Sequence, residues 1–248
     1  MKNIIYEDKD IIVAYKPAGI ATQTARACQR DMVSELKNYL AHAGGGEGEP
    51  YLGLVHRLDQ PVSGILVFAK NHQAAAKLGR QAADGRMGKY YYAVVWGRAK
   101  RQQGRLEDYL YKDGKANQSV VAQAGAPGAK KAILEYRAVK TLMVLEEGMG
   151  QPEYSQPFAE REVSLVEIRL LTGRHHQIRV QMSHEGMPLL GDGKYGSPKS
   201  RELSRIIGCR NVALCAYKLV FSHPVSGKEV TFERQPEGEI FQPFCPFP

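Results

Sequence analysis

A dense run of polar and charged residues that leads directly into an apolar segment constrains this chain most. The run reads His56-Arg57-Leu58-Asp59-Gln60-Pro61-Val62-Ser63-Gly64, and residues 65–69 after it are all apolar. Short apolar segments bounded by Pro and Gly are typical of buried strands. A core does not need a carboxylate, an arginine and a histidine within four residues. Because loops that enter rigid strands often carry catalytic groups, we expect an active site here, although an isolated Arg–Asp pair would instead indicate a surface pair.

The distribution of apolar residues predicts more strands than helices. Strands are expected at residues 11–15, 65–69, 89–97, 133–139, 163–171, 213–220 and 229–232. Helices are expected at residues 32–43 after Asp31, up to residue 83 after Asn71, and at residues 174–185 with Thr172 as the cap. We expect hairpins and loops over residues 98–131 and a loop insertion over residues 147–160. Because strands and helices do not alternate regularly, we predict an α+β fold with a mostly antiparallel sheet.

Length and charge narrow the class of protein. The 248 residues are expected to form one catalytic domain, 1–248, and the formal net charge of +8 favours an anionic partner such as nucleic acid. Charge alone is equally compatible with a merely basic protein. The four cysteines are scattered without a CxxC pair, so neither a zinc site nor a disulfide framework is expected. The chain shows no signal peptide and no apolar run of ~20 residues, so we expect a cytoplasmic protein away from membranes.

Two further segments carry residues suited to chemistry. Tyr90-Tyr91-Tyr92 begins a predicted strand, where alternation turns Tyr91 to the face opposite its neighbours. Thr172-Gly173-Arg174-His175-His176-Gln177-Ile178-Arg179 places two arginines at a predicted helix N-terminus, which favours an anion or a buried carboxylate. Adjacent histidines on a helix point about 100° apart, so we expect no metal site. Taken singly, each segment could also be ordinary core or solvated surface.

Taken together, the segments resemble one family. The ordered set is Lys16-Pro17-Ala18-Gly19, His56-Arg57-Leu58-Asp59 with Ser63-Gly64, Lys89-Tyr90-Tyr91-Tyr92-Ala93 with Trp96-Gly97, Gly173-Arg174-His175-His176-Gln177-Ile178-Arg179-Val180, and Leu190-Gly191-Asp192 with Tyr195-Gly196. It is similar to the RluA-type RNA pseudouridine synthases over about residues 11–232. The resemblance implies the pseudouridine synthase fold, a long bent mixed sheet with flanking helices and a central cleft. It also implies isomerisation of specific uridines to pseudouridine in ribosomal or transfer RNA, by base flipping and an aspartate-dependent mechanism.

The resemblance assigns roles residue by residue. Asp59 matches the catalytic aspartate, Tyr91 the active-site tyrosine, and Arg179 the arginine that pairs with the aspartate. Arg57 matches the arginine that helps to displace the flipped nucleotide. The remaining residues expected to bind the substrate RNA are His56, Arg174 and Gln177. No cofactor is expected, because the reaction involves neither redox chemistry nor group transfer. No metal is expected, because no set of Cys, His and acidic residues has metal-ligand spacing. A monomer is expected, and no protein partner is implied.

Some features depart from the family pattern or leave alternatives open. Val62 stands where threonine is usual, and His175 where a small polar residue or threonine is common. The N-terminal S4 module of many relatives is expected to be absent, so loops at residues 44–50, 112–131 and 147–160 would recognise the RNA. The alternatives are an RNA-binding protein without catalysis and an Asp/His hydrolase. The hydrolase would release a product, whereas an isomerase releases none.

Overall fold

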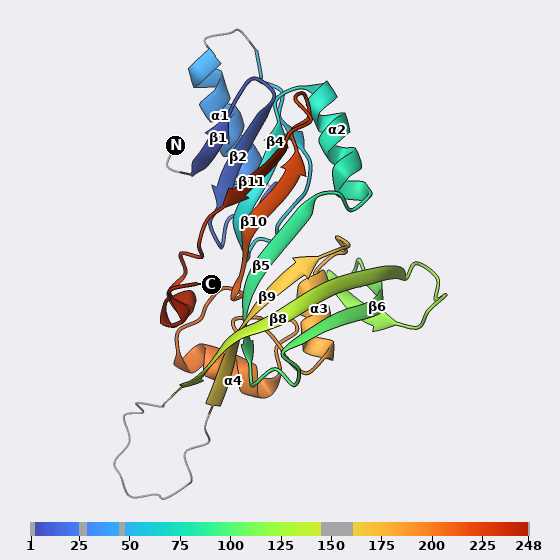
Figure 1. Ribbon diagram of the computed structural model, residues 1–248, viewed down its shortest axis with the longest axis vertical. Helices are drawn as coiled ribbons and strands as arrows, with labels where there is room; N and C mark the ends of the chain where they lie inside the picture. The colour runs from blue at the N-terminus through green and yellow to red at the C-terminus, as the bar shows by residue number, and fades with distance from the viewer. Residues whose placement is uncertain (1–2, 25–28, 45–47, 145–160, 248) are drawn as a thin grey trace, which may run out of the picture. The chain divides into compact units, whose positions relative to one another are not determined.

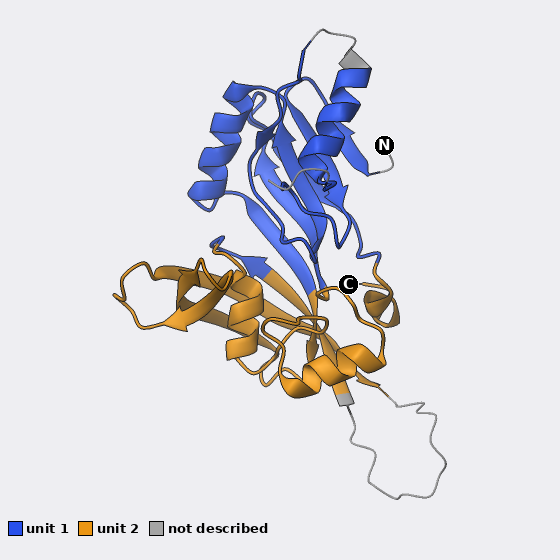
Figure 2. Ribbon diagram, turned by 180° about the vertical axis from the view of Figure 1, so that it is seen from behind, with its two compact units in different colours: residues 1–92, 169–173, 214–237 blue, residues 93–168, 174–213, 238–248 orange. Residues whose placement is uncertain are grey.

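The computed structural model describes residues 3–24, 29–44, 48–144 and 161–247. These residues form two compact units, coloured separately in Figure 2. Unit 1 comprises Met1–Tyr92, Arg169–Gly173 and Leu214–Glu237, and unit 2 comprises Ala93–Ile168, Arg174–Ala213 and Gly238–Pro248. Strand β5 (Gly88–Trp96) contributes residues to both units, so the single-domain prediction stays a prediction.

Unit 1 is built on a mixed sheet (Figure 1). Its elements are β1 (Ile4–Glu7), β2 (Ile11–Lys16), α1 (Met32–Gly44), β3 (Gly53–Leu54), β4 (Ser63–Ala69), α2 (His72–Ala83), β10 (Leu214–Ser222) and β11 (Glu229–Glu233). The strand order is β1-β2-β4-β10-β5, with β3 on β4 and β11 on β10. Strands β4 and β10 run parallel, while β2 pairs with β4 in antiparallel register from Ile11↔Ala69 to Lys16↔Gly64. The core lies along β2 and β4, whose apolar residues are almost wholly buried.

Capping residues fix the starts of the two helices of unit 1. The backbone N–H of Ser34 donates to Asp31 Oδ1 at 2.7 Å, and the N–H of Ala74 donates to Asn71 Oδ1 at 2.8 Å. Each bond satisfies an N–H that the first turn of a helix would otherwise leave without a partner. Helix α2 buries Ala74 and Leu78 and packs on β4 and β10. Both capping predictions are therefore confirmed.

Unit 2 also combines strands with helices. Its elements are the rest of β5, β6 (Gln103–Asp113), β7 (Gln118–Ala122), β8 (Lys130–Val144), β9 (Arg161–Leu170), α3 (Gln177–His184), α4 (Pro198–Ile206) and a 3₁₀ helix (Glu239–Phe244). The strand order is β5-β9-β8-β6-β7. Helix α3 packs on β6 and β7, where Leu110, Ala132 and Val180 form a buried cluster with Tyr195 beside it. The predicted α+β fold with a mixed, mostly antiparallel sheet is confirmed.

The structure corrects the sequence predictions at several elements. Helix α3 begins at Gln177 rather than residue 174, and its N-cap is His176 in a left-handed conformation (φ 53°) instead of Thr172. Strand β1 and helix α4 were not predicted, and β8 is longer than the expected 133–139. The expected loop insertion at 147–160 and the middle of the loop at 44–50 lie outside the described residues. Among the described residues, no helix is both long and apolar enough to cross a membrane.

Candidate active site

The turn from the charged run into β4 depends on a close approach of two strands in unit 1. Gly64 pairs with Lys16 of β2 on one side and with Ala216 of β10 on the other. Its φ of +136° suits glycine, and a Cβ at this position would lie 2.5 Å from the backbone N and O of Ala216. No other residue type combines this conformation with this contact. Gly64 therefore fixes where the preceding loop, which carries Asp59, leaves the sheet.

A buried lysine anchors the same loop. Lys16 is 0% exposed, and its ammonium donates to three carbonyls, Pro17 O at 3.0 Å, Ile20 O at 2.6 Å and Gln60 O at 3.1 Å. The Gly19 N–H also donates to Gln60 O, at 2.8 Å. Burial lowers the pKa of Lys16 to about 8, and the negative charge of Asp59 opposes this shift. Lys16 thus joins the end of β2 to the residue that follows Asp59.

Two more side chains hold the loop on the Asp59 side. The Thr22 hydroxyl donates to Leu58 O at 2.8 Å and accepts from Leu58 N at 3.1 Å. The Val67 N–H donates to His56 Nε2 at 3.3 Å, which ties the start of the run to β4. Burial, followed by the charge of Lys89, lowers the pKa of His56 to about 3. His56 is therefore neutral, with its ring proton on Nδ1, and Asp59 lies on a backbone fixed from both sides.

Asp59 and Tyr91 belong to the same unit and act on one another electrostatically. Asp59 is half-buried, whereas Tyr91 is only 5% exposed. Burial raises the pKa of Tyr91, and the negative charges of Asp59 and Cys215 raise it further. Tyr91 is consequently a neutral phenol over the physiological pH range. Its neighbours face the other way, where Tyr92 stacks on Tyr217 with ring centroids 4.1 Å apart.

Unit 2 contains a second preorganised group, a buried ion pair. Arg179 Nε donates to Asp192 Oδ2 at 2.7 Å and Nη2 donates to Oδ1 at 2.8 Å, with side-chain exposures of 5% and 1%. Burial pushes the pKa of Asp192 upward, but the bonds and charge of Arg179 and the N–H groups of Tyr195 and Lys194 lower it overall. Removing one partner of such a buried pair typically costs about 3–5 kcal/mol. The guanidinium of Arg179 is therefore held in one orientation.

Tyr195 extends this pair into a network. The carbon centre of the Arg179 guanidinium lies 5.1 Å from the centroid of the Tyr195 ring. The Tyr195 hydroxyl accepts from the Ser119 N–H at 2.8 Å, which leaves its own proton for His176 Nδ1 at 2.7 Å. This bond holds the ring of His176, the residue directly before α3 whose backbone is left-handed. The position of Arg179 is thus linked to strand β7 through Tyr195.

These features can be compared with known proteins. A family model described as RNA pseudouridylate synthase matches residues 10–184, well over half of the chain. The chain belongs to the RNA pseudouridine synthase family. Members of this family are enzymes that isomerise uridine to pseudouridine in RNA.

Individual relatives agree with this assignment. The synthase is 34% identical over 238 residues to "Ribosomal large subunit pseudouridine synthase D" of Zymomonas mobilis, covering 94% of this chain and 68% of that one. It is 33% identical to "Ribosomal large subunit pseudouridine synthase C" of Rickettsia bellii, covering 93% and 67%. The solved structure of "Human RNA Pseudouridylate Synthase Domain Containing 4" superposes with a TM-score of 0.73 at 19% identity, over 97% of this chain and 90% of that one. That likeness shows the fold, a pseudouridine synthase fold.

The predicted site residues of the synthase fall into two groups. His56, Arg57, Asp59 and Tyr91 lie in unit 1, and Arg174, Gln177 and Arg179 lie in unit 2. The pairing of Arg179 with Asp59 would join the two units and stays a prediction, as does the central cleft.

Two of the residues predicted to bind RNA make internal bonds in unit 2. Gln177 is 2% exposed, accepts from Arg174 N at 2.9 Å and donates to Ile133 O at 3.0 Å. This geometry gives Gln177 a role in holding α3 against β8. The exposed Arg174 precedes the helix instead of lying in it, and its Nε donates to Lys131 O at 2.9 Å. The RNA contacts of both residues stay predictions.

Reasoning from sequence gave no role to three residues of the synthase that position others. Lys16, Asp192 and Tyr195 all stand in segments that carry the family resemblance, but their partners lie elsewhere in the chain. Lys16 bonds to a residue 44 positions away and Tyr195 to one 76 positions away. The only signal in the sequence was the position of each residue inside a motif.

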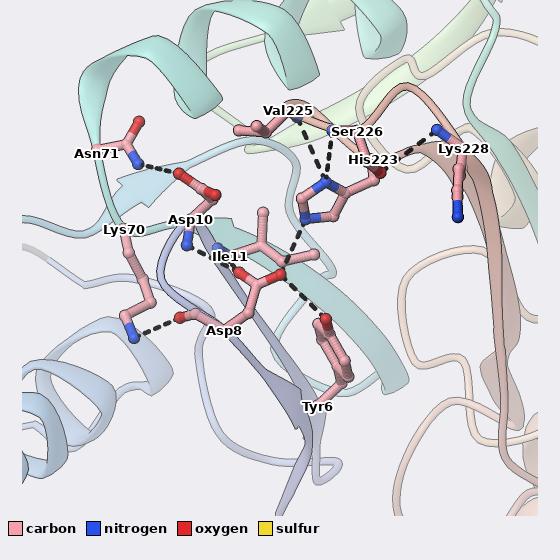
Figure 3. Close-up of polar contacts among 10 residues, drawn as sticks. All are labelled: Tyr6, Asp8, Asp10, Ile11, Lys70, Asn71, His223, Val225, Ser226 and Lys228. Atoms are coloured by element: carbon pink, nitrogen blue, oxygen red, sulfur yellow. Dashed lines mark hydrogen bonds and ion pairs between the residues drawn. The ribbon is translucent and has the colours of Figure 1, made fainter.

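A cluster of possible metal ligands lies in unit 1, where the β1–β2 turn meets the β10–β11 turn (Figure 3). Asp8 Oδ1 accepts from the N–H groups of Asp10 and Ile11, and Asp8 Oδ2 lies 2.9 Å from His223 Nε2. His223 Nδ1 accepts the Ser226 N–H at 3.2 Å, so the ring proton is on Nε2 and is donated to Asp8. A histidine that binds a metal does so through an unprotonated ring nitrogen and donates a hydrogen bond from its other nitrogen. In His223 the nitrogen that faces the carboxylates carries the proton. The cluster therefore joins the β1–β2 turn to the β10–β11 turn through hydrogen bonds.

Proposed function

We propose that this synthase isomerises specific uridines of ribosomal RNA, with Asp59 as the catalytic carboxylate. The observation that carries the proposal is the anchoring of the Asp59 loop by Lys16, Thr22 and Gly64 beside a buried, neutral Tyr91. The names of the relatives from Zymomonas mobilis and Rickettsia bellii favour RNA of the large ribosomal subunit over transfer RNA. We place the reaction in the cytoplasm and assign it to a monomer with one catalytic domain.

The reaction breaks the bond between N1 and C1′ of the uridine, rotates the uracil and rejoins it through C5. A base inside a stack cannot turn in this way, so the nucleotide must leave the stack. Arg57 is exposed on the Asp59 loop, where it can fill the vacated space and hold a phosphate. Asp59 acts either as a nucleophile at C1′ or as a base at C2′. In both routes its carboxylate must be ionised.

Two further residues complete the proposal. The raised pKa of Tyr91 keeps its hydroxyl protonated, which favours a stacking contact with the uracil over a role as the base that removes the proton from C5. Arg179 would keep Asp59 ionised in a dry site, since a nearby positive charge lowers the pKa of a carboxyl group. Its bidentate bond with Asp192 presents the guanidinium already oriented. We propose that His56, Arg174 and Gln177 contribute to RNA binding, and that the reaction itself depends on Asp59, Tyr91 and Arg179.

The direct test replaces Asp59 with asparagine, which is nearly isosteric but cannot act as a carboxylate nucleophile or base. We expect Asp59→Asn to retain its fold and RNA affinity and to lose turnover by more than about a thousandfold, as expected when a catalytic group is removed. Tritium release from uridine-labelled ribosomal RNA measures turnover. Asp84→Asn is the matched control, because it removes an exposed carboxylate that pairs with Arg86 at the end of α2.

Three outcomes would overturn the proposal. Turnover of Asp59→Asn within tenfold of the wild-type rate would make Asp59 a structural residue. Pseudouridine formation in transfer RNA alone, mapped at single-nucleotide resolution, would move the substrate away from the ribosome. Tight RNA binding by the wild-type protein with no pseudouridine formed would favour the alternative of an RNA-binding protein without catalysis.

A further inference from the structure

Strands β6, β7 and β8 of unit 2 have two faces, one of which packs on α3 (Figure 1). Leu110 of β6 and Ala132 of β8 lie on the α3 face, where both are buried with Val180 of the helix. Side chains two residues apart in a strand point the same way, so Lys112 and Lys130 lie on this face as well. The register agrees, because Lys130 is the partner of Leu110. Both lysines are exposed.

Two further basic side chains reach these strands from the segments on either side of α3. Arg174 precedes the helix, and its Nε donates to Lys131 O at 2.9 Å, beside Lys130. Lys194 follows the helix, and its Nζ donates to Asn117 O at 2.7 Å, directly before β7. Both side chains are exposed. Four residues are called the basic face below: Lys112, Lys130, Arg174 and Lys194.

The carboxylates closest to the basic face in the ladder and along the chain have other partners. Asp108, two residues before Leu110, accepts from Gln181 Nε2 at 2.9 Å. Asp113 accepts two N–H groups of the turn that follows it, and Asp192 forms the buried pair with Arg179. No member of the basic face forms an ion pair with a described residue. Its positive charge is therefore uncompensated by a paired carboxylate.

The opposite face of the same strands has balanced charge. Lys131, next to Lys130 in β8, pairs with Glu107 of β6. Arg105 pairs with Glu135 across the same two strands at 3.3 Å. All four of these paired residues are at odd-numbered positions of β6 and β8, so they point away from the α3 face. The excess of positive charge thus belongs to one face of the sheet only.

We propose that the basic face is a docking surface for the phosphate backbone of the substrate RNA. Its ammonium and guanidinium groups suit phosphates, and none of its four members offers a ring on which a base could stack. Such contacts position an RNA without reading its sequence. The proposal rests on the proposed function, and it gives Arg174, which the family resemblance assigns to RNA binding, three lysine partners.

The composition of the basic face favours RNA over an acidic protein. Three of its four members are lysines, and protein–protein interfaces are depleted of lysine. The charge also has the same sign as the net charge of +8 of the whole chain. A second copy of this basic chain would therefore be repelled.

The basic face is attached to the network that orients Arg179. Lys112 is the partner of Ser119 in the β6–β7 ladder. The Ser119 N–H donates to the Tyr195 hydroxyl at 2.8 Å, and the Tyr195 ring lies beside the Arg179 guanidinium. RNA bound to the basic face is thus held by the same elements that hold Arg179.

The test measures filter binding of unmodified ribosomal RNA over a series of salt concentrations. Every variant also carries Asp59→Asn, so that binding is separated from turnover. We expect Lys112→Gln/Lys130→Gln to reduce the log–log salt slope by about 1.4–1.8, or roughly 0.7–0.9 for each phosphate contact that is lost. Lys131→Gln is the matched control, because it removes the same charge from the neighbouring residue on the opposite face. It should leave the slope unchanged, since Glu107 already pairs with Lys131.

Three results would overturn the docking surface. The first is an unchanged slope in the double lysine variant. The second is a reduction in Lys131→Gln as large as that for each lysine of the basic face, which would show that the slope follows net charge alone. The third is an unchanged slope on isolated RNA with pseudouridine lost only in ribosomal particles, when the double lysine variant is made with Asp59 intact, which would indicate a protein partner. Failure of the proposed function would appear separately, as absence of pseudouridine with the wild-type protein.

Discussion

At the scale of single residues, Lys16 combines two demands that normally exclude one another. Its ammonium is fully buried, which disfavours the charged form, yet three carbonyls and the nearby Asp59 favour it. The result is a pKa of about 8 in place of the ordinary 10.5. A neutral amine has only two N–H donors, so deprotonation leaves one of the three carbonyls without its partner. The loop that holds Asp59 therefore loosens as Lys16 loses its proton.

We predict that kcat falls as the pH rises through about 8, because the charged form of Lys16 is present only below its pKa. The free energy of unfolding, in contrast, should rise with pH over the range in which the charged form of Lys16 is lost. Between about 8 and 10.5 the unfolded chain binds more protons at this site than the folded one, so stability from Lys16 rises with pH. The pH–rate profile and a ¹³C-lysine NMR titration measure the two effects.

Lys16→Met gives the matching control. It has no titrating group, so any activity that remains should lack the decline near pH 8. If the variant does not fold, the NMR titration of the wild-type protein still decides. A Lys16 resonance that titrates only above pH 10 would contradict the prediction.

At the scale of elements, the protein places glycine in two very different settings. Gly64 begins the buried part of β4, where a Cβ would lie 2.5 Å from backbone atoms of Ala216 and φ is +136°. Gly79 lies inside α2, and a Cβ there would have no heavy atom within 4 Å. The same substitution should therefore have opposite effects in the two elements.

We predict that Gly64→Ala destabilises the protein by roughly 3 kcal/mol or more, from strain and overpacking together. Gly79→Ala should stabilise it by about 0.5–1 kcal/mol, because alanine favours a helix interior. Urea unfolding of both variants measures the difference. A loss below 1 kcal/mol for Gly64→Ala would show that β10 can move away from β4, and a loss for Gly79→Ala would contradict the open surroundings of that position.

Elements whose boundaries depend on neighbouring residues were predictable from the sequence. Asn71 and Asp31 cap the helices that directly follow them. The apolar residues 65–69 predicted a strand, and they lie in β4. The start of α3 was not predictable, because a bond from Tyr195 fixes His176 and no side chain caps the helix. The start of helix α4 does have a local signal, because Ser197 stands at the N-cap and a proline follows it. A glycine-rich turn directly precedes this signal and makes it harder to recognise.

The residues of the candidate site also differ in whether the evidence for their role lies in neighbouring sequence. Asp59 could be identified because carboxylate, arginine and turn residues are neighbours in sequence. Lys16 and Asp192 could not be given roles, because each acts on a residue brought near by the fold. Periodicity and spacing do not reveal such partners.

At the scale of the whole molecule, the net charge of +8 should make RNA binding strongly dependent on salt. We predict that Arg57→Gln reduces the log–log salt slope for single-stranded RNA by about 0.7, the amount expected for one phosphate. Arg98→Gln should leave the slope unchanged, because Glu162 already pairs with Arg98 at 2.6 Å. Filter binding over a range of salt concentrations checks both values. Equal slopes for Arg57→Gln and the wild-type protein would remove Arg57 from the phosphate contacts.

The pairing of β4 with β10 also has a consequence for synthesis on the ribosome. Strand β4 ends at Ala69, but β10, which covers its edge beside Gly64, begins only at Leu214. At the rate of protein synthesis on the ribosome, the edge of β4 remains without its partner strand for on the order of ten seconds. A nascent chain with an uncovered apolar strand is open to aggregation, so we expect chaperones to bind it during this interval. The loop that carries Asp59 therefore reaches its final shape only after Leu214–Ser222 has left the ribosome.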